Sequence, residues 1–98
     1  MGADILLLDL GGLTLIADYF VITTGETDRQ LAAMTEDVLQ QLEEKHQIKC
    51  LHVEGAPESG WVLMDYGSVV VHLFSEAQRS YYQLEQLWKD AHTIVRMA

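Results

Sequence analysis

The sequence is short of basic residues. Its 98 residues contain six Lys and Arg against fifteen Asp and Glu, which gives a formal net charge of −9 at pH 7, and the basic residues are scattered along the chain. Binding to DNA or RNA depends on clustered Lys and Arg that release counterions from phosphates, so the composition argues against direct nucleic-acid binding. A basic protein is the partner that this charge favours.

Cysteine, proline and long apolar runs are also scarce. The single cysteine, Cys50, rules out an internal disulfide and fits a reducing compartment, and we interpret it as an inert strand residue. With Pro57 as the only proline there is no linker, so residues 1–98 are predicted to form one domain. The apolar run Ile5–Leu8 is too short to span a bilayer and does not follow a cationic start like that of a signal peptide. We therefore expect a cytoplasmic protein with no membrane partner.

The clearest pattern that is present is a β-hairpin. Two β-rich runs, 61–66 and 69–74, flank a turn at Gly67 and Ser68. This turn predicts the pairs Tyr66–Val69, Met64–Val71 and Val62–Leu73 on one face, and Asp65–Val70, Leu63–His72 and Trp61–Phe74 on the other. The first face is almost entirely apolar, whereas the second combines aromatic rings with an acid and an imidazole. That mixture suits recognition, but burial of Trp61 and Phe74 beneath a helix explains it equally well.

The rest of the chain predicts further strands and two helical regions. Strands are expected at Ile5–Leu10, Tyr19–Thr23 and Ile48–Glu54. Thr27 and Gln30 form a capping-box pattern before an amphipathic helix that runs to about His46. A last helical region is expected over 75–91. The order of elements predicts an α+β, sandwich-like fold, in which a single mixed sheet of about five strands packs against helices.

No group of residues forms a convincing catalytic or metal site. Asp65 and His72 share a predicted face and could act as an acid–base pair or as two metal ligands, but a structural hydrogen bond between them explains the pattern better. The Thr24–Thr27 segment lies between a strand and a helix, where phosphates often bind. It has one glycine and no following Lys, so helix capping accounts for it. We expect no enzyme activity, no metal and no cofactor; a residual nucleotide-binding or nucleotidyltransferase-like domain is the alternative.

Several blocks of residues, taken in order, carry a family resemblance. They are Ala17–Gly25 with Thr27, Arg29 and Gln30, then Glu54 and Gly55, then Trp61–Gly67, then Val69–His72, and finally Tyr82, Leu84, Glu85, Leu87, Trp88, Asp90 and Ala91. In these blocks the sequence closely resembles the ribosomal silencing factor family, also called RsfS or Iojap. The resemblance extends from about Asp4 to Ala91, which is most of the chain.

The resemblance implies both a fold and a function. It implies a nucleotidyltransferase-like fold without the catalytic carboxylates, which agrees with the lack of an Asp-x-Asp or Asp-x-Glu pair here. It also implies a translation repressor that binds the large ribosomal subunit through its fourteenth protein and blocks joining of the small subunit when nutrients are scarce. By that analogy the contact residues are Trp61, Tyr66, Phe74 and Tyr82. Asp65 and His72 join them because they share the predicted face of Trp61.

Two features depart from the family pattern. Ser68 stands where the family usually has Asp, which removes an acidic contact or alters the turn. The helix that usually precedes the first strand is missing from this sequence. Its absence is expected to expose apolar surface on the sheet and to favour a homodimer, so a pure dimerisation module is a third functional class.

Overall fold

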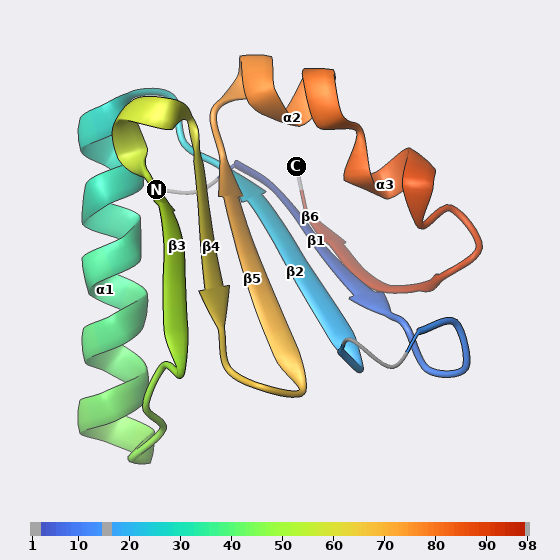
Figure 1. The fold of residues 1–98 in the computed structure, drawn as a ribbon, viewed down its shortest axis with the longest axis horizontal. Helices are drawn as coiled ribbons and strands as arrows, with labels where there is room; N and C mark the ends of the chain where they lie inside the picture. Colours follow the sequence, from blue (N-terminus) through green and yellow to red (C-terminus); the bar gives the residue numbers. More distant parts are fainter. Residues whose placement is uncertain (1–2, 15–16, 98) are drawn as a thin grey trace.

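The computed structural model describes residues 3–14 and 17–97. Within them the chain forms one six-stranded β-sheet with the order β3-β4-β5-β2-β1-β6 (Figure 1). The strands are β1 (Ala3–Asp9), β2 (Tyr19–Thr24), β3 (His52–Ala56), β4 (Trp61–Asp65), β5 (Val69–Phe74) and β6 (His92–Met97). β2 and β5 run parallel, and the other neighbouring pairs are antiparallel. The predicted α+β class with a mixed sheet is therefore confirmed, with one strand more than expected.

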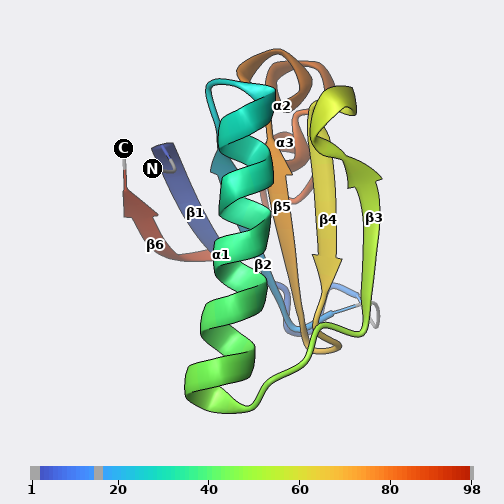
Figure 2. The same cartoon turned by 90° about the vertical axis from the view of Figure 1, so that its left-hand side faces the viewer.

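Helices cover the two faces of the sheet unequally. The long helix α1 (Asp28–His46) lies on one face, and the short helices α2 (Glu76–Tyr82) and α3 (Leu84–Leu87) lie on the other (Figure 2). A 3₁₀ turn, η1 (Pro57–Ser59), joins β3 to β4. β1 and β6 extend beyond α1, and Val95 and Met97 of β6 are exposed. An apolar strip of the sheet on the α1 side is thus left uncovered.

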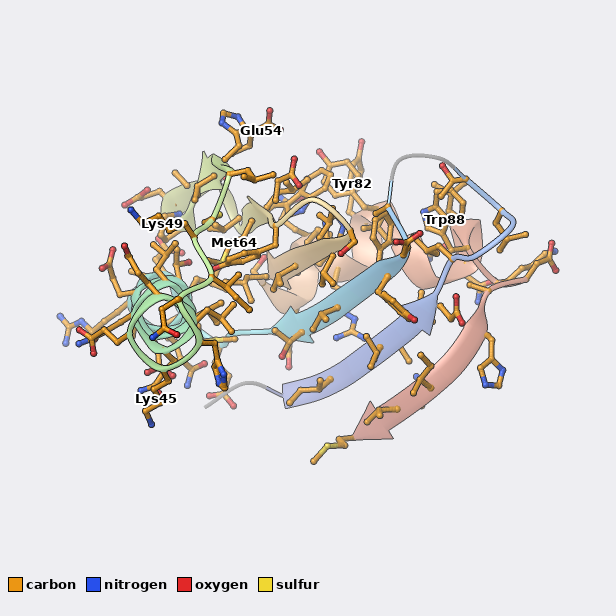
Figure 3. All side chains as sticks on the ribbon, turned by 90° about the horizontal axis from the view of Figure 1, so that it is seen from below. Lys45, Lys49, Glu54, Met64, Tyr82 and Trp88 are labelled. Atoms are coloured by element: carbon orange, nitrogen blue, oxygen red, sulfur yellow. The ribbon has the colours of Figure 1, made fainter. Side chains whose placement is uncertain are left out.

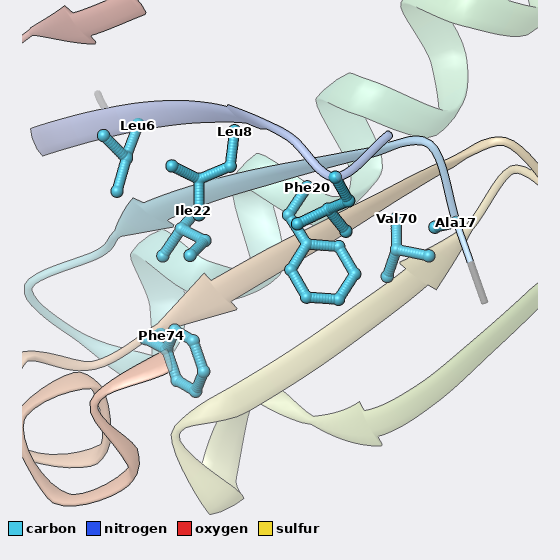
Figure 4. Packing of buried hydrophobic residues seen from close by; sticks show 8 residues of the cluster. Leu6, Leu8, Ala17, Phe20, Ile22, Val70 and Phe74 are labelled. Atoms are coloured by element: carbon cyan, nitrogen blue, oxygen red, sulfur yellow. The ribbon is translucent and has the colours of Figure 1, made fainter. Parts of the chain in front are cut away.

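Strand alternation divides the core into two layers. In β5, Val71 and Leu73 pack with Leu31 and Met34 of α1. Val70 and Phe74 point to the opposite face, where they join side chains of β1 and β2 in a second cluster (Figure 4). β5 is buried on both faces because α1 packs on one of them and α2 on the other.

The predicted hairpin is confirmed pair by pair. β4 and β5 pair from Trp61–Phe74 to Asp65–Val70, and the Tyr66 N–H donates to the Val69 carbonyl at 2.9 Å. Gly67 has a φ of 87°, a left-handed value that glycine adopts without steric cost. The Ser68 carbonyl accepts hydrogen bonds from the Asp18 and Tyr19 amides, which ties the turn to the start of β2. This connection to β2 is made by the backbone of Ser68, so it does not depend on which side chain this residue carries.

The third strand begins later than predicted. We expected Ile48–Glu54, but β3 covers His52–Ala56. Gln47 ends α1 in a left-handed conformation, with its N–H bonded to Glu43, and the Ile48 N–H reaches back to the Leu42 carbonyl. The bond from Gln47 to Glu43 is that of an αL-type helix end, and together with the Ile48 bond it commits the first apolar residues after α1 to a connection.

The predicted last helix is broken, and a sixth strand follows it. Gln83 has a φ of 49° and ends α2, so that α3 starts in a new direction at Leu84. After Ala91 the chain returns along β1 as the antiparallel edge strand β6. β6 escaped prediction because all its side chains are exposed, so no buried face marks it in the sequence.

Candidate functional site

The α2–α3 face of the sheet carries a cluster of aromatic side chains. We call it the aromatic cluster, and its members are Phe20, Trp61, His72, Phe74, Tyr82 and Trp88. Trp61 is central, with its ring centroid 5.1 Å from that of Phe74 and 4.5 Å from that of Tyr82. Figure 3 shows Tyr82 and Trp88 on the same side of the sheet as Glu54, away from Lys45 of α1. The hairpin supplies the base of this cluster, and the C-terminal helices supply its rim.

A hydrogen bond links the two polar members of the cluster. The indole Nε1–H of Trp61 donates to Nδ1 of His72 at 3.2 Å. His72 is only 4% exposed, and burial lowers its pKa from 6.5 to about 4. The ring is therefore neutral at pH 7 and carries its proton on Nε2, which has no hydrogen-bond partner among the described residues. His72 is a buried structural acceptor, and it is not poised as a base.

The predicted hydrogen bond between Asp65 and His72 is wrong. Asp65 Oδ1 accepts from the Gly67 amide at 2.8 Å and so closes the hairpin turn. Asp65 pairs with Val70, one diagonal step from His72, whereas the turn amide lies two residues away along the chain. Asp65 therefore forms the local hydrogen bond to the turn, and Nδ1 of His72 accepts from the Trp61 indole instead.

Tyr66 lies apart from the other candidates. It packs on the α1 side of the sheet against the cluster that contains Met64, so it does not share a surface with Trp61. Burial raises the pKa of its hydroxyl, and the neighbouring Cys50 adds to this effect. The structure thus brings four of the six predicted site residues together in the aromatic cluster, places Asp65 at the turn on the same face, and puts Tyr66 behind the sheet.

Three members of the aromatic cluster reach the surface, namely Trp61, Tyr82 and Trp88. Phe74 is fully buried, and His72 nearly so. Trp61 is half-buried, and Tyr82 is 45% exposed at the end of α2. A partner on this face would therefore meet Trp61 and Tyr82, with His72 and Phe74 supporting them from beneath.

A cavity opens beside Trp61 and Tyr82. It has a volume of about 280 Å³ and is lined by Glu54, Gly55, Ser59, Trp61, Leu63, Gln78 and Tyr82. Glu54 and Gln78 were missed by the sequence reasoning. Glu54 reaches the cavity because it pairs with Leu63 across β3 and β4. The sequence prediction started this strand too early and did not give its register with β4. Glu54 Oε1 also lies 3.1 Å from Nε2 of His52.

Two glycines allow the cavity walls to approach each other. Gly55 has a φ of 80°, and a Cβ there would lie 2.2 Å from the Trp61 carbonyl oxygen. Gly60 also has a φ of 80°, and a Cβ there would lie 2.7 Å from side-chain atoms of both Ser75 and Gln78. A larger residue at either position would push β3 or α2 away from Trp61.

The Thr24–Thr27 segment caps α1, as predicted. Thr27 Oγ1 accepts from the Gln30 amide at 3.0 Å, and the Gln30 side chain accepts from the Glu26 amide. The Gly25 amide donates to the Phe74 carbonyl at 2.8 Å. Each of these three amides already has an acceptor within the fold, so none of them is free to bind a phosphate.

The described residues offer neither a metal site nor a membrane-spanning helix. No group of three or more His, Cys, Asp and Glu side chains among them is placed to hold a metal ion. None of the helices in residues 3–14 and 17–97 has the length and apolar character needed to cross a membrane.

Comparison with known proteins identifies relatives along the whole chain. A family model described as "Ribosomal silencing factor during starvation" matches residues 1–98. The chain is 48% identical over 88 residues to ribosomal silencing factor RsfS of Bacillus subtilis, covering 90% of this chain and 74% of that protein. It is 38% identical over 76 residues to mouse "Mitochondrial assembly of ribosomal large subunit protein 1", covering 72% of this chain and 32% of that protein.

Solved structures agree with these sequence matches. A crystal structure of a Chromobacterium violaceum protein superposes with a TM-score of 0.84 at 38% identity, over 90% of this chain and 72% of that one. A crystal structure of a Bacillus halodurans protein gives a TM-score of 0.78 at 33% identity, over 96% of this chain and 84% of that one.

Proposed function

This chain belongs to the ribosomal silencing factor (RsfS) family, and we propose that it represses translation by binding the large ribosomal subunit. Its family membership makes it a ribosome-associated regulator of translation. The finer proposal is that it contacts the fourteenth protein of that subunit and sterically blocks joining of the small subunit under nutrient limitation. In this proposal the chain acts by occupying a surface, without a catalytic step.

The observation that carries the proposal is that the Trp61–Tyr82 pair reaches the surface of a strongly acidic chain. Protein interfaces concentrate their binding energy in a few aromatic anchors, and Trp and Tyr are enriched among them. Both rings rest on the buried side chains of the aromatic cluster, so they are held in place before a partner arrives. The net charge of −9 favours a basic protein surface over RNA.

Sedimentation with purified ribosomal subunits tests this function. We expect the chain to co-sediment with large subunits and to leave small subunits unbound. Large subunits loaded with the chain should then form fewer complete ribosomes when small subunits are added, because the joining surface is occupied. Unchanged ribosome formation by fully loaded large subunits would refute the steric mechanism.

A second measurement separates protein from RNA as the main contact. The isolated fourteenth protein should capture this chain without ribosomal RNA. Binding dominated by RNA would instead weaken steeply with salt, because each neutralised phosphate releases counterions. Capture by whole subunits, combined with failure of the purified protein pair to associate, would argue against a contact made mainly through protein.

A further inference from the structure

The cavity beside Trp61 combines aromatic walls with a carboxylate. The ring centroids of Trp61 and Tyr82 lie 4.5 Å apart at an interplanar angle of 48°, so the two rings pack against each other, and both line the cavity. Glu54 stands on the β3 side of the same cavity, and its side chain is 62% exposed. Among the described residues that line the cavity, Glu54 is the one charged side chain.

This combination is chemically selective for a cation. The face of an aromatic ring attracts Lys and Arg head groups through its quadrupole, and Trp is the strongest of the aromatic residues in this respect. A carboxylate beside the rings adds a charge-assisted hydrogen bond, and Arg can satisfy it with two parallel N–H groups. Gln78 and Ser59 add polar atoms to the rim. An apolar side chain would gain from the rings but would offer Glu54 no cationic partner besides the His52 imidazole that already lies 3.1 Å from it.

The size of the cavity limits its occupant. Pockets that hold whole small-molecule ligands have volumes of about 300 to 1,000 Å³. At about 280 Å³ this cavity falls just below that range. A cavity of this volume has room for one long side chain such as that of Arg or Lys.

We propose that this cavity receives a single Arg or Lys side chain from the basic protein partner, with Trp61 and Tyr82 against its charged head group and Glu54 paired with it. The proposal rests on the proposed function, because it names the chemistry by which the same surface recognises its partner. Trp61 and Tyr82 then act as a receptor for a cation, and the affinity of the partner depends on Glu54 as well as on the two rings.

A titration with a small cationic probe tests the cavity by itself. The probe is N-acetyl-arginine amide, and its uncharged isostere, N-acetyl-citrulline amide, is the control ligand. Both are followed by the NMR signal of the Trp61 indole N–H, which is assigned by its loss in Trp61→Phe. We expect saturable shifts with the arginine compound and none with the citrulline compound.

Surface variants then test the same cavity with the whole partner. Tyr82→Leu keeps an apolar side chain but removes the aromatic face, and it should weaken large-subunit binding about tenfold. Glu54→Gln should weaken it about threefold to tenfold and reduce its salt dependence. Tyr82→Phe should bind like the unmodified chain. Tyr19→Leu is the matched control, because Tyr19 is also a partly exposed tyrosine, on β2, and does not line the cavity.

The outcomes separate this inference from the proposed function. Large-subunit binding that Tyr82→Leu and Glu54→Gln leave unchanged, together with equal shifts from both probes, would overturn the cation site while the proposed function stands. Selective arginine binding by a chain that ignores ribosomal subunits would support the cation site and overturn the proposed function. Circular dichroism of each variant confirms that the comparison is made between folded proteins.

Discussion

Trp61 and His72 are joined across the hairpin by an indole N–H that donates to an imidazole nitrogen 3.2 Å away. The bond ties the most accessible strand residue of the aromatic cluster to one of its most buried members. It also fixes the tautomer of His72, because the nitrogen that accepts cannot carry the proton. The orientation of the Trp61 ring, on which the cavity depends, is thereby set by a residue that a partner does not reach.

This bond should be measurable as an energetic coupling. Trp61→Phe keeps an aromatic ring but leaves the buried Nδ1 of His72 without a donor, so it should lower the free energy of unfolding by about 1–3 kcal/mol. In a His72→Phe background there is no buried Nδ1 to be left without a donor, so Trp61→Phe should lower the free energy of unfolding by less. Urea denaturation of the four proteins gives the coupling energy. Strictly additive losses would show that the bond contributes nothing.

His72 should make the stability of the protein depend on pH. Its folded pKa of about 4 lies below the unfolded value of 6.5, so the neutral form is favoured by folding. The resulting stability is fully present above pH 6.5 and is lost as the pH falls from 6.5 through about 4. Between about pH 7.5 and about pH 4, the free energy of unfolding should fall by about 3 kcal/mol more in the unmodified chain than in His72→Phe. Parallel pH profiles of the two proteins would contradict a buried neutral His72.

Trp61→Ala should impair binding more than a comparable change elsewhere in the aromatic cluster. Loss of an interface anchor should cost at least about 2 kcal/mol of binding, or about thirtyfold in affinity for the large subunit. Trp88→Ala is the matched control, because Trp88 is also half-buried on this face but does not line the cavity. Both variants should be destabilised by less than the roughly 3–5 kcal/mol expected for a fully buried Trp. Denaturant midpoints and binding are measured on the same samples, and equal binding by the two variants would refute the assignment of Trp61.

Gly55 should tolerate no side chain. In Gly55→Ala the new Cβ would meet the Trp61 carbonyl oxygen at 2.2 Å in addition to requiring a positive φ, so the loss of stability should exceed about 2 kcal/mol. Gly12→Ala has the same backbone requirement with a φ of 83°, but nothing lies within 4 Å of its Cβ. Its cost should stay near the roughly 1–2 kcal/mol of left-handed strain alone. Thermal denaturation distinguishes the two, and equal losses would show that contact with Trp61 is unimportant.

Nucleotides should leave the melting temperature unchanged. A ligand at a hundredfold excess over its dissociation constant stabilises a protein by about 2.7 kcal/mol, a shift that thermal melting detects easily. The Gly25, Glu26 and Gln30 amides already have acceptors in the fold, so we expect no shift with ATP, GTP or CTP and magnesium. A saturable rise in melting temperature would favour the residual nucleotide-binding domain instead.

Local chemistry in the sequence was sufficient for the hairpin and for the start of α1. The Gly67–Ser68 turn sets which residues of β4 and β5 face each other, and strand alternation then places Trp61, His72 and Phe74 on one face. The Thr27 cap is likewise a contact between residues three apart. Such features depend on neighbours along the chain, so they can be read without knowing the rest of the fold.

The cavity, the sixth strand and the partner of His72 were decided by tertiary structure. Tyr82 reaches Trp61 only because α2 folds back over β4 and β5, and Glu54 reaches them only through the register of the edge strand β3. β6 pairs with a strand at the opposite end of the chain, and its exposed side chains carry no pattern of burial. Asp65 accepts from the Gly67 amide, and His72 instead accepts from the Trp61 indole. In each case the deciding energy comes from contacts between residues far apart in sequence, or from competition between acceptors, which a one-dimensional pattern does not record.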